Sequence, residues 1–265
     1  MQIPLKQFLG AATGLLFSTL PLSGQACALG SVNVGLFDFP PYYHQTDDAR
    51  PEGQLVDLFD HVMGQVGCPW QARFFDSVPR LLEAMTSGST QIAMLIHHPL
   101  LERHALFGTR SLAPLVLNTY HLPDRSAAMH LNDLRNRRLI LIRGYGYGGL
   151  VDTLLDPENG ITAVIAESHR DGFKRLQANQ GDYLLNYEGP ATETRNAMGL
   201  YHVEHSALRT WDVVFVISRQ VPQANKRLAE LEAALDSASP PRGLALTATP
   251  KRGPQLKTPG VDGPP

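Results

Sequence analysis

The stretch "LILIRGYGYGG", residues 139–149, ends an apolar run in a glycine-rich loop, and the helical pattern "GLVDTLL" follows directly. A buried strand that leads through glycines into a helix is the unit from which α/β folds are built. Gly144, Gly146 and Gly149 also have the Gly-x-Gly-x-x-Gly spacing of a dinucleotide-binding turn, with Glu167 near the expected place of its ribose-binding acid. The stretch therefore predicts an α/β fold and raises the question of what the loop binds.

The same alternation of strand and helix signals runs through most of the chain. Apolar runs and period-2 patterns predict strands over 31–37, 69–75, 91–96, 112–122, 138–142, 161–166, 182–187 and 212–218. Amphipathic patterns with capping residues predict helices over 52–67, 78–87, 149–155 and 168–181, and a last one after Pro222 that carries Leu228, Leu231 and Leu235. Strands that alternate with helices in this way predict mostly parallel sheets flanked by helices.

Two extended segments, near 113–121 and 207–213, bracket the middle of the chain. We interpret them as two hinge strands that join two α/β lobes. Lobe 1 is then predicted over 29–114 plus 212–238, and lobe 2 over 115–211.

The N-terminus has the pattern of a secretory signal peptide. Lys6 supplies a positive charge, residues 8–22 form a short apolar region, and Ala26-Cys27-Ala28 fits the A-x-A cleavage rule. We therefore predict a signal peptide over 1–28 and a periplasmic location. Cleavage before Cys27, which would give a lipoprotein, is the less favoured alternative because the usual leucine three residues earlier is missing.

Cleavage after Ala28 would remove Cys27 and leave Cys68 as a lone cysteine, so no intrachain disulfide is expected. The net charge of −2 gives no sign of a nucleic-acid partner. Residues 239–265 are dense in Pro and Gly and lack periodicity, which predicts a disordered tail.

Several segments, in order, resemble the periplasmic solute-binding proteins of family 3, the extracytoplasmic receptors of polar-amino-acid ABC importers. The first strand and its aromatic turn, "VNVGLFDFPPYY", and the helix "EGQLVDLFDHVMGQVG" begin the series. "VPRLLEAMTSGSTQIAML", "LLERHALFGTRSLAP", "LNDLRNRRLILIRGYGYGGLVDTLL" and "GFKRLQANQGDYLLNY" continue it. The resemblance implies a two-lobed periplasmic-binding-protein type II fold. It further implies a monomer without catalysis or cofactor that takes up a small polar solute, such as an amino acid, and docks on an ABC permease in the inner membrane.

The resemblance also places a ligand site in the cleft between the lobes. Arg103 matches the family's carboxylate-binding arginine, while Leu100 and Tyr187 stand where the family has a threonine and the aspartate that holds an α-amino group. With the aromatic turn and the glycine loop, the predicted ligand-binding residues are Phe39, Tyr42, His97, Arg103, Tyr145, Gly146, Tyr147, Tyr187 and Glu188.

The sequence admits four other interpretations. His97, His98 and His104 invite a zinc interpretation, but neighbouring residues of an extended chain point to opposite sides, so no metal site is predicted. An NAD enzyme is disfavoured because the glycine loop follows a complete α/β lobe instead of opening the domain. A dehydratase of the cyclohexadienyl type would need a general acid, for which Glu188 is the candidate, and a sensory partner of a membrane kinase is the remaining alternative.

Overall fold

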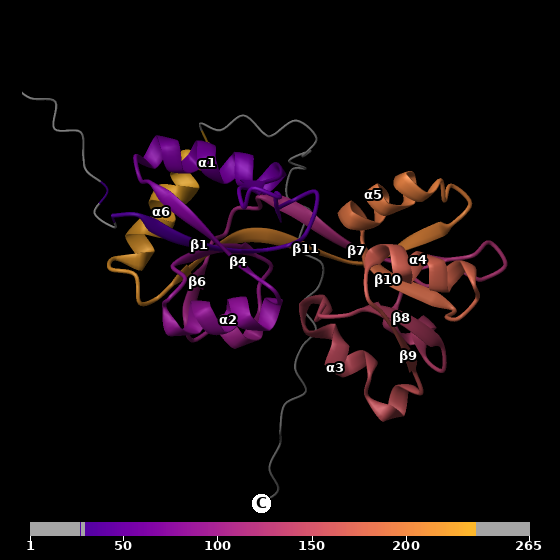
Figure 1. The fold of residues 1–265 in the computed structure, drawn as a ribbon. Helices are drawn as coiled ribbons and strands as arrows, with labels where there is room; N and C mark the ends of the chain where they lie inside the picture. Colours follow the sequence, from indigo (N-terminus) through magenta and orange to yellow (C-terminus); the bar gives the residue numbers. More distant parts are fainter. Residues whose placement is uncertain (1–26, 28–29, 237–265) are drawn as a thin grey trace, which may run out of the picture.

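The computed structural model describes residue 27 and residues 30–236. The predicted signal peptide, apart from Cys27, and the predicted tail lie outside the described residues. Lobe 1 is built around the parallel strands β1 (Val32–Phe37), β4 (Trp70–Phe75) and β5 (Ile92–Leu95), with β1 in the middle. The helices α1 (Gln54–Val66), α2 (Val78–Ser87) and α6 (Ala224–Leu235) cover this sheet (Figure 1).

Lobe 2 repeats the arrangement. Strand β8 (Arg138–Ile142) lies between β9 (Thr162–Ala166) and β10 (Tyr183–Tyr187), and all three are parallel. The helices around this sheet are α3 (Leu150–Leu154), α4 (His169–Gln177) and α5 (Glu188–Met198). Smaller elements complete the two lobes: β2 (His44–Gln45), β3 (Pro51–Glu52) and β6 (Ala105–Phe107), and the 3-10 turns η1 (Pro99–Leu101), η2 (Leu131–Leu134), η3 (Tyr147–Gly149) and η4 (Pro157–Asn159).

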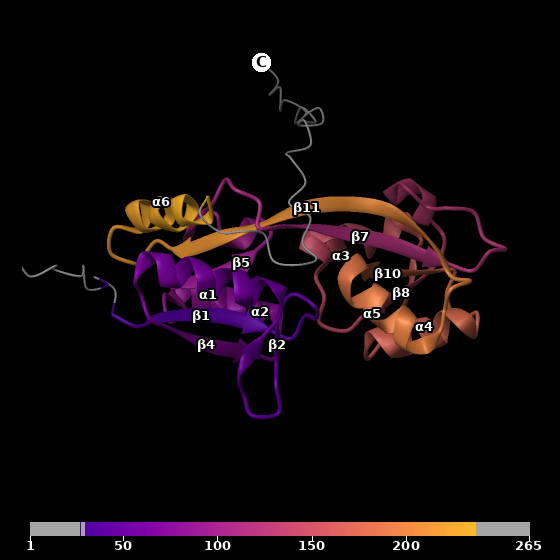
Figure 2. The ribbon, with the colours of Figure 1, turned by 90° about the horizontal axis from the view of Figure 1, so that it is seen from above.

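Two long antiparallel strands run from one lobe into the other (Figure 2). Strand β7 (Ala113–His121) pairs with the first part of β11 (Glu204–Ser218), from Glu204↔His121 to Val213↔Ala113. The last part of β11 then pairs with β5 in lobe 1, while β7 pairs with β10 in lobe 2. The predicted two-lobed α/β architecture is therefore confirmed, although β11 begins eight residues before the predicted strand over 212–218.

The predicted helices form where an apolar stripe meets a capping signal. Helix α1 buries Leu55, Leu58, Phe59 and Val62 on one face. It ends at Gly67, whose φ of 72° is accessible to glycine without the penalty that a Cβ would impose. Helix α4 begins after Ser168, whose hydroxyl accepts the Asp171 N–H as an N-cap. No helix within the described residues is long and apolar enough to cross a membrane.

Helix α5 was not predicted. It starts directly at the end of β10 with the sequence Glu-Gly-Pro, which is typical of a turn. Glu188 was therefore expected at the end of a strand, and the structure makes it the first residue of this helix.

The expectation of an unpaired Cys68 is wrong. Cys27 and Cys68 form a disulfide that closes a sequence separation of 41 residues, with their Cα atoms 4.9 Å apart. Cys68 follows the C-terminal end of α1, so the bond fastens the start of the described chain to lobe 1. The error came from placing the cleavage after Ala28, which discards Cys27. The disulfide also uses the thiol that lipid attachment would need.

Candidate functional site

A cavity lined from both lobes lies where the carboxyl ends of β1, β8 and β10 meet. We call it the aromatic cavity, because Phe39, Tyr42, Tyr43, Tyr145, Tyr147 and Tyr187 line it. The volume open to the centres of water molecules is about 80 Å³, enough for several waters but small for a metabolite. The rings contact one another across this cavity, which leaves it small.

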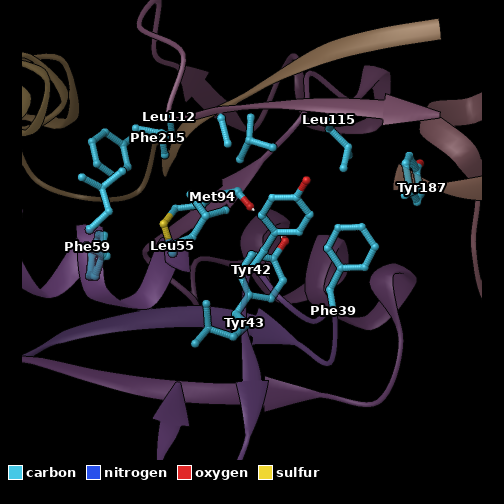
Figure 3. Close-up of a cluster of buried hydrophobic side chains, with 14 of the residues drawn as sticks. Phe39, Tyr42, Tyr43, Leu55, Phe59, Met94, Leu112, Leu115, Tyr187 and Phe215 are labelled. Atoms are coloured by element: carbon cyan, nitrogen blue, oxygen red, sulfur yellow. Dashed lines mark hydrogen bonds between the residues drawn. The ribbon is translucent and has the colours of Figure 1, made fainter. Parts of the chain in front are cut away.

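Lobe 1 supplies a packed group of rings from the turn after β1. Phe39 stacks on Tyr42 with ring centroids 5.3 Å apart, and the Tyr43 hydroxyl donates to the Met94 carbonyl at 3.4 Å. Phe39 also reaches across the cleft and meets Tyr145 and Tyr187 edge to face, at 5.9 and 5.4 Å. Figure 3 shows Phe39, Tyr42 and Tyr43 on one side and Tyr187 on the other. These contacts hold the lobes against each other through rings of low polarity.

The glycine loop brings lobe 2 into the cleft with an unusual backbone. Tyr147, Gly148 and Gly149 have φ values of 48°, 65° and 88°, so three consecutive residues are left-handed. A Cβ on Gly148 would lie 2.8 Å from the Trp211 ring and 3.0 Å from the Ile96 side chain. Glycine is needed here because the loop approaches the hinge strand and lobe 1 closely.

The two tyrosines of the loop have different tasks. The Tyr147 hydroxyl is buried, accepts the Ile142 N–H at 2.7 Å and donates to the Leu185 carbonyl at 3.3 Å, which ties β8 to β10. The Tyr145 hydroxyl instead lies 3.0 Å from His169 Nε2, and His169 Nδ1 lies 2.9 Å from Asn186 Oδ1. Tyr147 therefore supports the loop, while Tyr145 is the outer end of a hydrogen-bonded chain.

Burial sets the protonation of these groups. It raises the pKa of Tyr42 to about 12, assisted by the charge of Glu188, and raises the pKa of Tyr145 and of Tyr187 further. The tyrosines therefore stay neutral at physiological pH. Burial also lowers the pKa of His169, against the opposing effects of Asn186 and Asp38, and so favours its neutral form.

A second cavity, which we call the polar cavity, adjoins the aromatic cavity at Phe37, Val78 and Tyr145. In the same measure its volume is about 300 Å³, and it includes Asp38, Asp76, Arg143, Glu167 and His169 among its lining residues. Arg143 donates two hydrogen bonds of 2.7 Å to Glu167. The acid that the dinucleotide interpretation would assign to a ribose is thus paired with arginine, and α3, which follows the loop, has only five residues.

The structure gathers six of the predicted site residues at the aromatic cavity: Phe39, Tyr42, Tyr145, Gly146, Tyr147 and Tyr187. It places the other three outside. Arg103 is exposed and lines neither cavity, and Glu188 is exposed on α5. The His97 ring packs on Phe107 at 4.3 Å, and its neighbour His98 lines the aromatic cavity instead.

The role of His169 and Asn186 was missed. His169 was read only as a residue after the Ser168 cap, and Asn186 as the interior of a strand. Their contact arises because the strands β9, β8 and β10 lie side by side, which brings the ends of distant segments together. Among the described residues, no three His, Cys, Asp or Glu side chains converge as metal ligands would.

No protein-family model matches the chain, and no curated protein sequence matches it. Solved structures do. A histidine kinase sensor domain with similarity to periplasmic binding proteins has a TM-score of 0.64 at 19% identity, covering 78% of this chain and 89% of that one.

Two further structures have comparable scores. The GluR0 ligand-binding core in complex with L-glutamate has a TM-score of 0.64 at 13% identity, covering 79% of this chain and 94% of that one. The periplasmic VFT2 domain of BvgS from Bordetella pertussis has a TM-score of 0.61 at 17% identity, covering 79% and 88%. The chain therefore has the two-lobed fold of the periplasmic binding proteins, as the sequence resemblance predicted.

Proposed function

We propose that the chain is an extracytoplasmic binding protein that captures a small polar solute between its lobes and delivers it to an ABC importer. The observation that carries the proposal is the pair of adjoining cavities lined from both lobes and spanned by the two strands β7 and β11. A two-strand connection permits hinge closure around a ligand. A crystal structure of an amino acid ABC transporter's substrate-binding protein, with a TM-score of 0.58 and 12% identity, has the same fold.

In this proposal the lobes are 29–114 plus 212–238 and 115–211, and they hinge near 113–121 and 207–213. The protein works as a monomer in the periplasm after removal of a leader that ends before Cys27, which the disulfide needs, and the closed form docks on the permease. Phe39, Tyr42, Tyr145 and Tyr187 are the residues we propose to contact the ligand body, since they meet across the cleft.

A sensory role is the second candidate. It is favoured by the likeness to a histidine kinase sensor domain and to a periplasmic domain of BvgS. In that role the closed lobes would signal to a membrane receptor instead of a permease. An enzyme of the dehydratase type is less well supported, because Glu188, the acid assigned to it, is exposed and lines neither cavity.

Ligand binding is tested by thermal melting in a broad library of amino acids, amines and organic acids, because a ligand of the folded state raises the melting temperature. Gly189→Ala provides a matched variant. Its Cβ would lie 2.8 Å from the Tyr42 ring across the cleft and would wedge the lobes apart. We expect the variant to fold and to lose most of the ligand-induced shift. A library without any hit would contradict the proposal.

Transport and sensing are then separated in cells that lack the gene. Loss of uptake of the identified ligand supports delivery to an importer. Unchanged uptake, together with loss of ligand-dependent gene expression, supports the sensory role.

A further inference from the structure

The polar cavity carries an excess of negative charge, with three carboxylates and one guanidinium on its walls. Two of the carboxylates have partners. Glu167 holds Arg143 through two hydrogen bonds, and Asp76 forms an ion pair with Arg80 at 3.2 Å. Asp38, at the end of β1, has no hydrogen bond or ion pair to any of the described residues. An unpaired carboxylate therefore faces the cavity from lobe 1.

The opposite wall, in lobe 2, includes one hydrogen-bond acceptor that is set by its neighbours, the Tyr145 hydroxyl oxygen. Asn186 is fully buried, and its Oδ1 faces His169 Nδ1, which fixes the proton of the neutral ring on Nδ1. His169 Nε2 is then an acceptor, and the Tyr145 hydroxyl donates its hydrogen bond to it. The Tyr145 oxygen is left with lone pairs only, so it can accept a hydrogen bond from a ligand but not donate one.

The cavity offers a carboxylate ligand no cationic side chain that is free of an ion pair within the described residues. Its one guanidinium, that of Arg143, forms a bidentate pair with Glu167. Arg103 lies outside both cavities. Releasing Arg143 to a ligand would leave the Glu167 carboxylate without its partner, so the exchange gains little. A zwitterionic amino acid would bring its carboxylate to a cavity whose side chains carry three negative charges and one positive charge.

We propose that the polar cavity binds the positively charged group of an organic amine that has no carboxylate, between Asp38 on lobe 1 and Tyr145 on lobe 2. This inference rests on the proposed binding function and names its ligand class. The aromatic cavity, which shares Tyr145, takes the carbon body of the amine against Phe39 and Tyr187 as the lobes part and reclose. The ligand links the lobes because its positive charge pairs with Asp38 on lobe 1 and one of its N–H groups donates a hydrogen bond to Tyr145 on lobe 2.

The experiment compares amines with the amino acids from which they differ only by the carboxylate. The probes are putrescine against ornithine, agmatine against arginine, and tyramine against tyrosine. Binding is measured by calorimetric titration and by the shift in melting temperature. We expect at least one amine to bind at least tenfold more tightly than its amino acid.

Two variants locate the site. Asp38→Asn keeps the shape of an exposed side chain and removes its charge. We expect it to weaken amine binding roughly tenfold or more, because a hydrogen bond to a charged group is stronger than one between neutral groups. Tyr145→Phe removes the acceptor oxygen and should weaken binding severalfold. Asp47→Asn is the matched control, because Asp47 is exposed in the same lobe and lines neither cavity. It should bind amines as the parent protein does.

The outcomes separate this inference from the function on which it rests. Binding of an amino acid or organic acid without binding of the amines overturns the ligand class and leaves the binding function standing. Amine binding that Asp38→Asn does not weaken overturns the site. A complete lack of binding, in these pairs and in the broad library, overturns both.

Discussion

The ring of Phe39 in lobe 1 stands edge-on against the ring of Tyr187 in lobe 2, with centroids 5.4 Å apart and planes at 89°. Both residues are buried, and their rings pack against each other across the boundary between the lobes. The two lobes thus share a small apolar core at the place where a ligand would enter. Opening the cleft exposes these rings to water, which is unfavourable. The binding free energy of a ligand between the lobes must offset this loss.

Replacing Phe39 tests this shared core. In Phe39→Leu the edge contacts to Tyr145 and Tyr187 are lost, at about 0.5–1.5 kcal/mol for each aromatic pair. We expect the lobes to separate more readily, which small-angle X-ray scattering would record as a larger radius of gyration. Phe173→Leu is the control, because Phe173 packs on Tyr120 entirely within lobe 2. It should lower the melting temperature without changing the radius, and equal radii for the two variants would argue against a closing role of Phe39.

The buried hydroxyl of Tyr147 is expected to matter for stability. Tyr147→Phe leaves the Ile142 N–H without its acceptor in the interior, which costs about 1–3 kcal/mol. Urea denaturation should show this loss. Tyr201→Phe is the matched control, since Tyr201 is 78% exposed and should tolerate the change. Equal stability of the two variants would mean that the hydroxyl does not support the loop.

His169 should make stability depend on pH. Its pKa is lowered in the folded state, chiefly by burial, so the unfolded chain binds more protons in the range between the folded and unfolded values. The contribution to stability is complete above the unfolded pKa, near 6.5, and is lost as the pH falls toward the folded pKa.

We therefore expect the melting temperature to fall between pH 8 and pH 5.5, and to fall less in His169→Gln. The pKa values of His98 and His205 are also lowered, mainly by burial, but these residues are present in both proteins. The difference between the two pH profiles consequently reports His169. Parallel profiles would contradict the assignment.

The disulfide between Cys27 and Cys68 lets us predict both the stability of the protein and the first residue of its mature chain. Closing a loop of 41 residues stabilises the folded state by roughly 3–4 kcal/mol in the chain-entropy model, so Cys68→Ser should lower the unfolding free energy by that amount. Reductant should bring the parent protein to the same level. Because Cys27 is needed, the exported chain should begin at Cys27 or before it, and intact mass spectrometry would reveal this. A mature chain that starts at Leu29, as cleavage after Ala28 would give, would contradict the disulfide.

The sequence was most informative where a pattern is local. Val32, Val34 and Leu36 alternate along β1, and the stripe of α1 ends at Gly67, so these elements were predicted nearly to the residue. Helix α5 was missed because tertiary packing, and not its own periodicity, maintains a helix that begins with Glu-Gly-Pro. Local periodicity and capping signals do not predict elements whose stability comes from packing against segments that are distant in the chain.

The candidate site shows the same division. The aromatic turn and the glycine loop were predicted to contact a ligand, because aromatic faces can stack on a ligand and glycines expose backbone N–H groups at a helix start. The pairing of Tyr145 with His169, and of Arg143 with Glu167, joins residues 24 apart in the chain, and it exists because β8 and β9 are adjacent. Arg103 was chosen by resemblance to a motif, and its segment turns outward here.

Ala113, at the start of β7, is paired with Val213 of β11, and this pairing limits how the lobes can move. The chain enters and leaves lobe 2 at two neighbouring points of one ribbon, so lobe 2 is an insertion whose ends already touch. A ribbon of two strands resists stretching, because each strand is already close to its full extension, but it twists and bends easily. The register shift between Ala207 and Arg209 marks the place where this ladder is interrupted. Relative motion of the lobes should accordingly be a rotation about this ribbon, with little change in the distance between their attachment points.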